Sequence, residues 1–305
     1  MSSQSTQTLS LSHWRDYLAL CKPKIVSLIV FTAVVGMFMA TPGMVPISVL
    51  VYGTIGIGLA AASAAAINHV VDHKIDSVMA RTMRRPLPKG NVSIQSAIMF
   101  AFMLGALSMI ILTYFVNALT AILTAVSLIG YGFIYSMYLK RATPQNIVIG
   151  GAAGAAPPVL GWTAVTGTLD PHSLLLFLII FAWTPPHFWA LAIYRRNDYA
   201  SVDIPMLPVT HGPEFTRLHI LLYTIVLTIV TILPFLTYMS GPVYLVGALI
   251  LDAGFLYYAI RMQTDTNDRL AMQTFSYSII YLMVLFAMLL IDHYVPLMLQ
   301  FLYTL

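Results

Sequence analysis

The chain has 305 residues, of which 59% are hydrophobic and 9% are charged, and its formal net charge is +4. A soluble domain has about 25% charged residues, so this chain lacks the polar groups that would cover a globular surface in water. We therefore predict an all-α, polytopic membrane protein. The basic excess does not indicate a nucleic-acid partner, because the basic residues lie in short loops between apolar runs, where they orient membrane helices.

The N-terminal segment, residues 1–23, is polar to amphipathic. It lacks an apolar core followed by a small-residue cleavage site, so we expect no removable signal peptide. The single cysteine, Cys21, excludes a disulfide within the chain.

Nine stretches are apolar and long enough to cross a bilayer, which takes about 20 residues. They are 25–42, 46–67, 93–114, 117–137, 145–165, 172–193, 218–238, 242–260 and 275–295. Turn signals such as TPGMVP, TGTLDP and SGP separate several of them. The glycine-rich run IVIGGAAGAAPPVLGW suits close packing between helices.

All 15 Lys and Arg residues fall before the first span or in the loops after the second, fourth, sixth and eighth spans. Basic residues mark the cytoplasmic side of a membrane. We therefore predict a cytoplasmic N-terminus and, after nine spans, a periplasmic C-terminus. An eight-span count would scatter the basic residues over both sides.

The end of the second span carries Asn68, Asp72 and Asp76, whose i, i+4, i+8 spacing places them on one helix face. Two carboxylates this close repel each other unless a cation lies between them. Mg2+ is the natural candidate, because proteins usually hold it with one or two carboxylates and substrate phosphates. Bases suited to phosphate follow at Arg81, Arg84, Arg85 and Lys89. The pattern predicts a site for a diphosphate on a lipid-soluble tail; the alternative is a solvated loop with this spacing by chance.

A second acidic segment follows the sixth span, where Asp198 and Asp203 lie beside Arg195 and Arg196. We predict that it faces the first segment across one pocket, with the acids as metal ligands and the bases on the diphosphate. Asp198 and Asp203 are five apart and share a helix face poorly, and the alternative is an ordinary cytoplasmic turn.

Two further segments contain candidate residues. Lys140 ends the fourth span and is predicted to reach the diphosphate, whereas the tyrosines before it, Tyr131, Tyr135 and Tyr138, favour an interfacial aromatic belt. His187 lies inside the sixth span, where ionisable residues are rare and usually functional.

The prolines before His187 are expected to break the helix and line a cavity; the alternative is a packing histidine. Asp252, in the eighth span, has no assigned role. His69 and His73 have metal-ligand spacing, but no further zinc ligand lies nearby.

These motifs resemble the UbiA superfamily of intramembrane aromatic prenyltransferases, from about Lys22 to the ninth span. The superfamily pattern is N-x3-D-x3-D, from Asn68 to Asp76, followed by M-x-R-T-x-R-R-P-L, from Met79 to Leu87. The run WTPPHFW, from Trp183 to Trp189, resembles the branch of the superfamily that acts on haem.

The resemblance implies that farnesyl diphosphate and haem B react to give haem O and diphosphate, for respiratory oxidases. It implies a single domain over residues 1–305 in a bacterial inner membrane, with the mouth of the active site facing the cytoplasm. Asn68, Asp72 and Asp76 would hold Mg2+ and diphosphate, and Arg81, Arg84 and Arg85 would neutralise the leaving group.

Asp198 matches the second acidic motif, but its D-x4-D spacing departs from the usual D-x3-D and puts Asp203 in doubt. We expect His187 to meet the haem iron or a propionate. A haem A synthase and oxidase assembly proteins are the expected downstream partners.

Two alternatives stay open at this stage. Another enzyme of the superfamily would use 4-hydroxybenzoate or a naphthoate as acceptor. An anionic-lipid transporter would carry ionisable residues along a central path, whereas here they cluster at one mouth.

Overall fold

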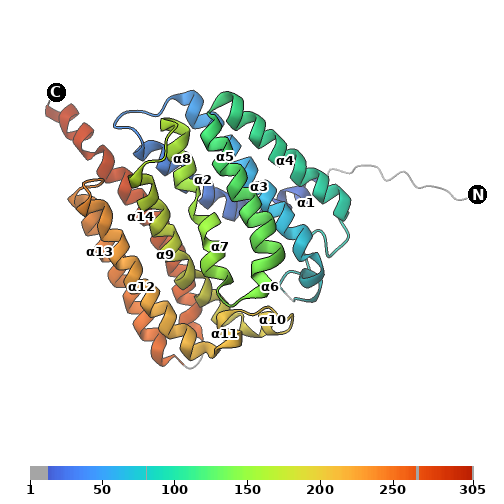
Figure 1. Cartoon of the computed structure of the whole chain (residues 1–305). Helices are drawn as coiled ribbons and strands as arrows, with labels where there is room; N and C mark the ends of the chain where they lie inside the picture. The colour runs from blue at the N-terminus through green and yellow to red at the C-terminus, as the bar shows by residue number, and fades with distance from the viewer. Residues whose placement is uncertain (1–12, 80, 266–267, 304–305) are drawn as a thin grey trace, which may run out of the picture.

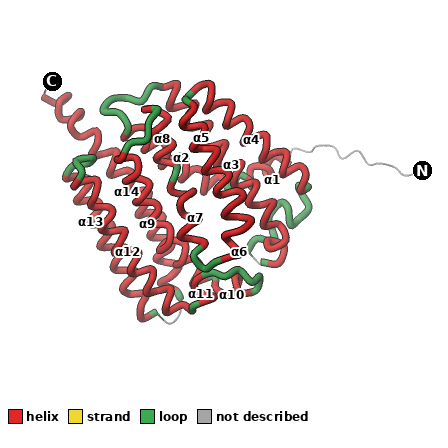
Figure 2. Tube along the Cα trace, in the orientation of Figure 1, coloured by secondary structure: helices red, strands yellow, loops and turns green. Residues whose placement is uncertain are grey.

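In the computed structural model, which describes residues 13–79, 81–265 and 268–303, helices follow one another along the chain and these residues form no strand (Figures 1 and 2). Residues 1–12 of the predicted cytoplasmic segment lie outside the described part. The α-helices are α1 (His13–Leu20), α2 (Pro23–Met39), α3 (Ile47–Val78), α4 (Ile94–Phe115), α5 (Ala118–Ile129), α6 (Lys140–Ala142), α7 (Asn146–Ala155), α8 (Pro157–Thr166), α9 (Pro171–Tyr194), α10 (Arg196–Ala200), α11 (Leu207–Thr210), α12 (Gly212–Leu236), α13 (Pro242–Arg261) and α14 (Arg269–Tyr303). A π-helix, η1 (Gly130–Leu139), and a 3-10 turn, η2 (Met262–Thr264), complete the set.

Eight helical segments of the described chain are long and apolar enough to cross a membrane. A ninth span would combine α1 and α2, which meet at an angle of 54°. Pro23 begins α2 and has no backbone N–H to continue α1, which explains a break at this point. The all-helical prediction is confirmed, whereas the count of nine and the orientation in the membrane stay predictions.

The three turn signals fall between α2 and α3, between α8 and α9, and between α12 and α13, as predicted. Asp170 in the second turn caps α9 by accepting a hydrogen bond from the His172 N–H. The C-terminal end of α3 differs from the prediction, because this helix continues to Val78, well beyond the predicted end at residue 67. The acidic motif therefore belongs to the helix itself and not to a loop.

The glycine-rich run packs closely against α2, as predicted. A methyl group on Gly161 would lie 1.9 Å from the Ala33 carbonyl oxygen, and one on Gly36 would lie 2.1 Å from the Pro158 carbonyl oxygen. The backbones of α2 and α8 therefore touch where both helices carry glycine.

Asp252, which had no assigned role, joins three helices. Its carboxylate accepts hydrogen bonds from Tyr281 Oη of α14 at 2.6 Å and from Thr231 Oγ1 of α12 at 2.8 Å. Both oxygens of this buried carboxyl group are thus hydrogen-bonded. We interpret Asp252 as a packing residue of the α12–α14 side of the bundle.

Candidate active site

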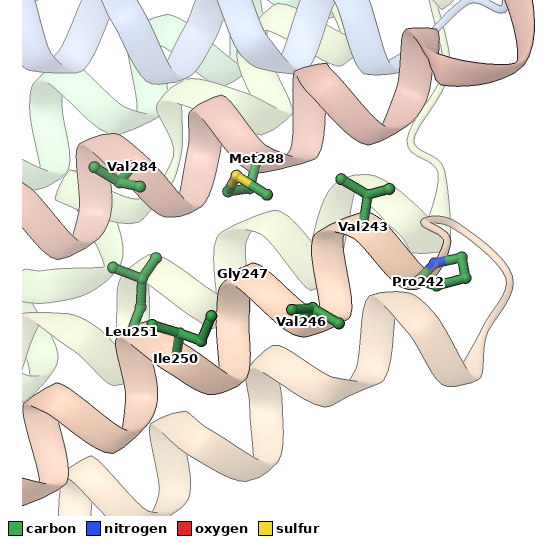
Figure 3. Close-up of a pocket in the computed structure, with 8 residues that line it drawn as sticks. All are labelled: Pro242, Val243, Val246, Gly247, Ile250, Leu251, Val284 and Met288. Carbon is green, nitrogen blue, oxygen red and sulfur yellow. The ribbon is translucent and has the colours of Figure 1, made fainter. Parts of the chain in front are cut away.

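A cavity of about 710 Å³ lies between α2, α3, η1, α7, α9 and α14. It extends from the charged end of α3 to the aromatic side chains around His187. A second hollow, of about 570 Å³, lies between α13 and α14 (Figure 3). Its lining is entirely apolar, with Val246 and Ile250 exposed on the helix surface, so it offers no group for chemistry. The first cavity is therefore the candidate site.

Asn68, Asp72 and Asp76 line this cavity from one face of α3, as their spacing predicts. All three are at most 5% exposed. Buried carboxylates need partners, and each of these has one. Lys140 Nζ lies 2.6 Å from Asp72 Oδ2, and Arg85 Nη1 lies 2.7 Å from Asp76 Oδ2.

The donor set fits Mg2+ together with a diphosphate. Asp72 Oδ1 is buried and has no hydrogen-bond partner, so one hard oxygen ligand is left free. Among the described residues, no group of three or more His, Cys, Asp or Glu side chains could hold a metal. The chain thus presents two carboxylates and the Asn68 amide, and substrate phosphate would have to complete an octahedral site.

Five basic and two acidic side chains line the cavity, which leaves a formal excess of three positive charges at one end. The basic residues are Lys22, Lys24, Arg81, Arg85 and Lys140. This charge complements a diphosphate. The other predicted phosphate ligands do not line the cavity: Arg84, Lys89, Arg195 and Arg196.

Sequence reasoning missed Lys22, which it treated only as a marker of membrane orientation. Lys22 lies just before α2 with a left-handed backbone (φ 49°), and its Nζ donates a hydrogen bond to Asn68 Oδ1. Burial, reinforced by the nearby charge of Arg85, lowers the pKa of Lys22 to about 7. No local signal identifies this residue, because its partner lies 46 positions further along the chain.

The second acidic segment reaches the cavity through a tyrosine. Tyr199 of α10 lines the cavity, and burial raises its pKa while the charge of the adjacent Arg81 opposes that shift. Asp198 does not line the cavity but lies beside Tyr199, with an oxygen 3.6 Å from Arg195 Nη1. Asp203 is exposed, in a turn with a left-handed backbone (φ 54°). Neither of these two acids therefore lines the cavity with Asp72 and Asp76.

The π-helix η1 explains how tyrosines and Lys140 reach the cavity together. Tyr131 and Lys140 are nine residues apart, about 2.5 turns of an α-helix, which would place them on opposite sides. The wider π-helical turns bring Tyr131, Tyr135 and Lys140 to the cavity side. The aromatic-belt interpretation is therefore wrong for Tyr131 and Tyr135, whereas Tyr138 is 69% exposed and agrees with it.

His187 lines the inner part of the cavity. Its imidazole stacks on Trp183 at 4.1 Å and on Phe275 of α14 at 4.6 Å between ring centroids. The expected helix break is wrong, because α9 continues through Pro185 and Pro186. Packing of α9 against α7, α12 and α14 holds the helix together despite the missing N–H groups.

A family model described as the UbiA prenyltransferase family matches residues 29–297. The chain is 61% identical to a protein named protoheme IX farnesyltransferase from Methylococcus capsulatus, over 93% of this chain and 95% of the relative. It is also 61% identical to a protein of the same name from Nitrosococcus oceani, over 94% and 96% of the two chains.

Solved structures show the same fold at low sequence identity. A structure of digeranylgeranylglyceryl phosphate synthase aligns with a TM-score of 0.78 and 18% identity, covering 93% of this chain and 99% of the other. A UbiA homolog from Archaeoglobus fulgidus bound to GPP and Mg2+ aligns with a TM-score of 0.60 and 17% identity, covering 90% and 99%.

Proposed function

This chain belongs to the UbiA prenyltransferase family, and on that premise we propose that it transfers the farnesyl group of farnesyl diphosphate to a vinyl group of protohaem IX. The products are diphosphate and haem O. The single observation that carries the proposal is one cavity with a charged end at Asp72 and Asp76 and an aromatic end at His187. The name shared by the relatives from Methylococcus capsulatus and Nitrosococcus oceani supports the choice of acceptor.

In this reaction the allylic C–O bond of farnesyl diphosphate breaks, and its electron pair leaves on the diphosphate. One vinyl carbon of the haem bonds to the farnesyl group. Water then adds its oxygen to the other vinyl carbon and releases a proton, which accounts for the hydroxyl group of haem O.

The charged end would bind the diphosphate. Asn68, Asp72 and Asp76 would hold Mg2+, which when bound neutralises charge that develops on the leaving group. Arg85 and Lys140 neutralise the carboxylates of α3 in the structure and would turn to the diphosphate oxygens when these arrive. Asp198 stays a proposed second metal contact, supported by its place next to Tyr199 of the cavity wall.

The inner part of the cavity would hold the farnesyl chain and the acceptor. Small side chains of α3 and α7, including Ala60, Ala64 and Gly154, line it and leave room for an apolar chain. Such a lining keeps water away from the allylic cation until the vinyl group reacts. His187, which reaches this region, would contact the haem iron or a propionate.

We also propose that the protein lies in the bacterial inner membrane with the charged end of the cavity toward the cytoplasm. The C-terminal ends of α3 and α9 lie with α6 on one side of the bundle, the lower side in Figure 1. Arg81 and Arg85 of the site follow α3 in the chain, and Lys140 begins α6. A water-soluble diphosphate would then enter and leave on that side. Haem O would pass to a haem A synthase or to oxidase assembly proteins.

The direct test incubates the purified protein with haem B, farnesyl diphosphate and Mg2+, followed by mass spectrometry of the porphyrin fraction. We expect the mass of haem O to appear and to require both substrates. Product from 4-hydroxybenzoate or a naphthoate, with none from haem B, would overturn the proposed acceptor.

A further inference from the structure

The imidazole of His187 is held on both faces by aromatic rings. Trp183 stacks on it with an interplanar angle of 17° and Phe275 with an angle of 26°. Trp183 and Phe275 make no ring contact with each other, as expected when they cover opposite faces of the imidazole. What His187 can offer to the cavity is therefore the edge of its ring.

One nitrogen on that edge is already used. His187 Nδ1 lies 2.6 Å from Ser278 Oγ, and the same Oγ donates a hydrogen bond to the Phe275 carbonyl oxygen at 2.7 Å. A serine hydroxyl has one hydrogen to donate. Both short contacts are satisfied together when the hydroxyl donates to Phe275 and accepts from His187 Nδ1–H.

In the other neutral tautomer, Nδ1 carries a lone pair and can only accept. The Ser278 hydroxyl could then donate either to Nδ1 or to the Phe275 carbonyl oxygen, and the remaining short contact would join two lone pairs. The hydrogen-bond pattern thus assigns the Nδ1–H form to His187. Its Nε2 then carries a free electron pair, and it has no hydrogen-bond partner among the described residues.

The backbone of Ser278 supports the same arrangement. Trp183 Nε1 donates a hydrogen bond to the Ser278 carbonyl oxygen at 2.8 Å, so the stacking ring is also tied to α14. Ser278 is fully buried and lies 91 positions from His187. One residue of α14 therefore orients two aromatic side chains of α9.

We propose that Ser278 is a positioning residue that fixes His187 as the Nδ1–H tautomer, so that Nε2 binds the iron of the haem substrate. Neutral imidazole is a ligand through one nitrogen while the other donates a hydrogen bond, which sets the ring orientation and raises the basicity of the ligand. This inference rests on the proposed haem acceptor and specifies how the acceptor is held.

The test compares iron protoporphyrin IX with metal-free protoporphyrin IX, each titrated into the purified full-length protein and followed by the Soret absorption. In the Ser278→Ala variant we expect iron protoporphyrin to bind about 10-fold more weakly, and metal-free protoporphyrin to bind as in the wild type. His187→Ala should show the same selective loss. Ser278→Thr, which keeps a hydroxyl able to bond the preceding turn, should restore binding.

Ser276→Ala is the matched control, since Ser276 is exposed on the same helix and bonds the Met272 carbonyl oxygen. It should leave both affinities unchanged. Equal weakening of both porphyrins in Ser278→Ala, or unchanged iron protoporphyrin binding, would overturn the positioning role. Farnesyl diphosphate binding, measured in parallel, reports that each variant is folded.

The outcome is separable from that of the proposed function. If the wild-type protein forms haem O and Ser278→Ala binds iron protoporphyrin normally, the positioning role fails while the proposed function stands. If the wild-type protein forms no haem O and gives product with a phenolic acid, the proposed function fails as well.

Discussion

Replacing Asp72 with Asn removes one negative charge from the candidate diphosphate site and keeps the shape of the side chain. Asp72 is 3% exposed, and its Oδ2 pairs with Lys140 at 2.6 Å and accepts from Asn68 Nδ2 at 3.0 Å. The Asp72→Asn variant would therefore leave the Lys140 ammonium without its partner and weaken the oxygen set proposed for Mg2+.

The size of the effect follows from this geometry. Removing one partner of a buried, hydrogen-bonded charge pair costs about 3–5 kcal/mol. If the reaction depends on that interaction in the transition state, kcat/KM falls roughly 200- to 5,000-fold. The loss should be accompanied by a higher Mg2+ concentration for half-maximal rate.

The assay measures haem O formation at several concentrations of farnesyl diphosphate and Mg2+. Asp170→Asn is the matched control, because Asp170 caps the far end of α9 and Asn caps a helix as well as Asp does. That control should stay within about 2-fold of the wild type. A folded Asp72→Asn protein with more than about one tenth of the wild-type kcat/KM would refute the placement of the metal and diphosphate on α3.

Three further substitutions test other parts of the structure. Asp198→Asn should raise the Mg2+ concentration for half-maximal rate about 10-fold if the second acidic segment contributes to metal binding, and an unchanged Mg2+ dependence would remove Asp198 from the proposed site. Gly161→Ala should lower the free energy of unfolding in detergent by about 1–3 kcal/mol, because the added methyl group would meet the Ala33 carbonyl oxygen. Gly43→Ala, the control, has open space around it and should have little effect. Equal stabilities of the two variants would contradict the close contact of α2 and α8. Asp252→Ala should destabilise the fold by about 1–3 kcal/mol, because it leaves the buried Tyr281 hydroxyl without its acceptor, whereas the Thr231 hydroxyl keeps the Thr228 carbonyl oxygen. The activity of the folded fraction should persist, and a large loss of activity at normal stability would show that Asp252 is not a packing residue.

The acidic face of α3 was predictable because it is a local property. Asn68, Asp72 and Asp76 share a face through helical spacing alone, and the structure contains that face. The length of α3 was not predictable from hydropathy. The apolar run ends where polar residues begin, but these polar residues stay helical because they are buried and line the cavity.

The tyrosines of the fourth span show a second limit. Their position at the end of a span predicted an aromatic belt, but in the π-helix η1 both Tyr131 and Tyr135 line the cavity. Likewise, Pro185 and Pro186 indicated a helix break by local rules, but neighbouring helices hold α9 intact. Tertiary packing overrides local preference in both cases.

The sequence by itself determined that this is an all-helical membrane protein, that its basic residues gather in alternate loops, and that one helix face carries a carboxylate pair. These features are encoded by contiguous residues through hydropathy and helical period. Only the tertiary structure decided which bases converge on the carboxylates, and that Ser278 orients His187. Those contacts join residues up to 91 positions apart, and helix packing, which no local pattern encodes, brings them together.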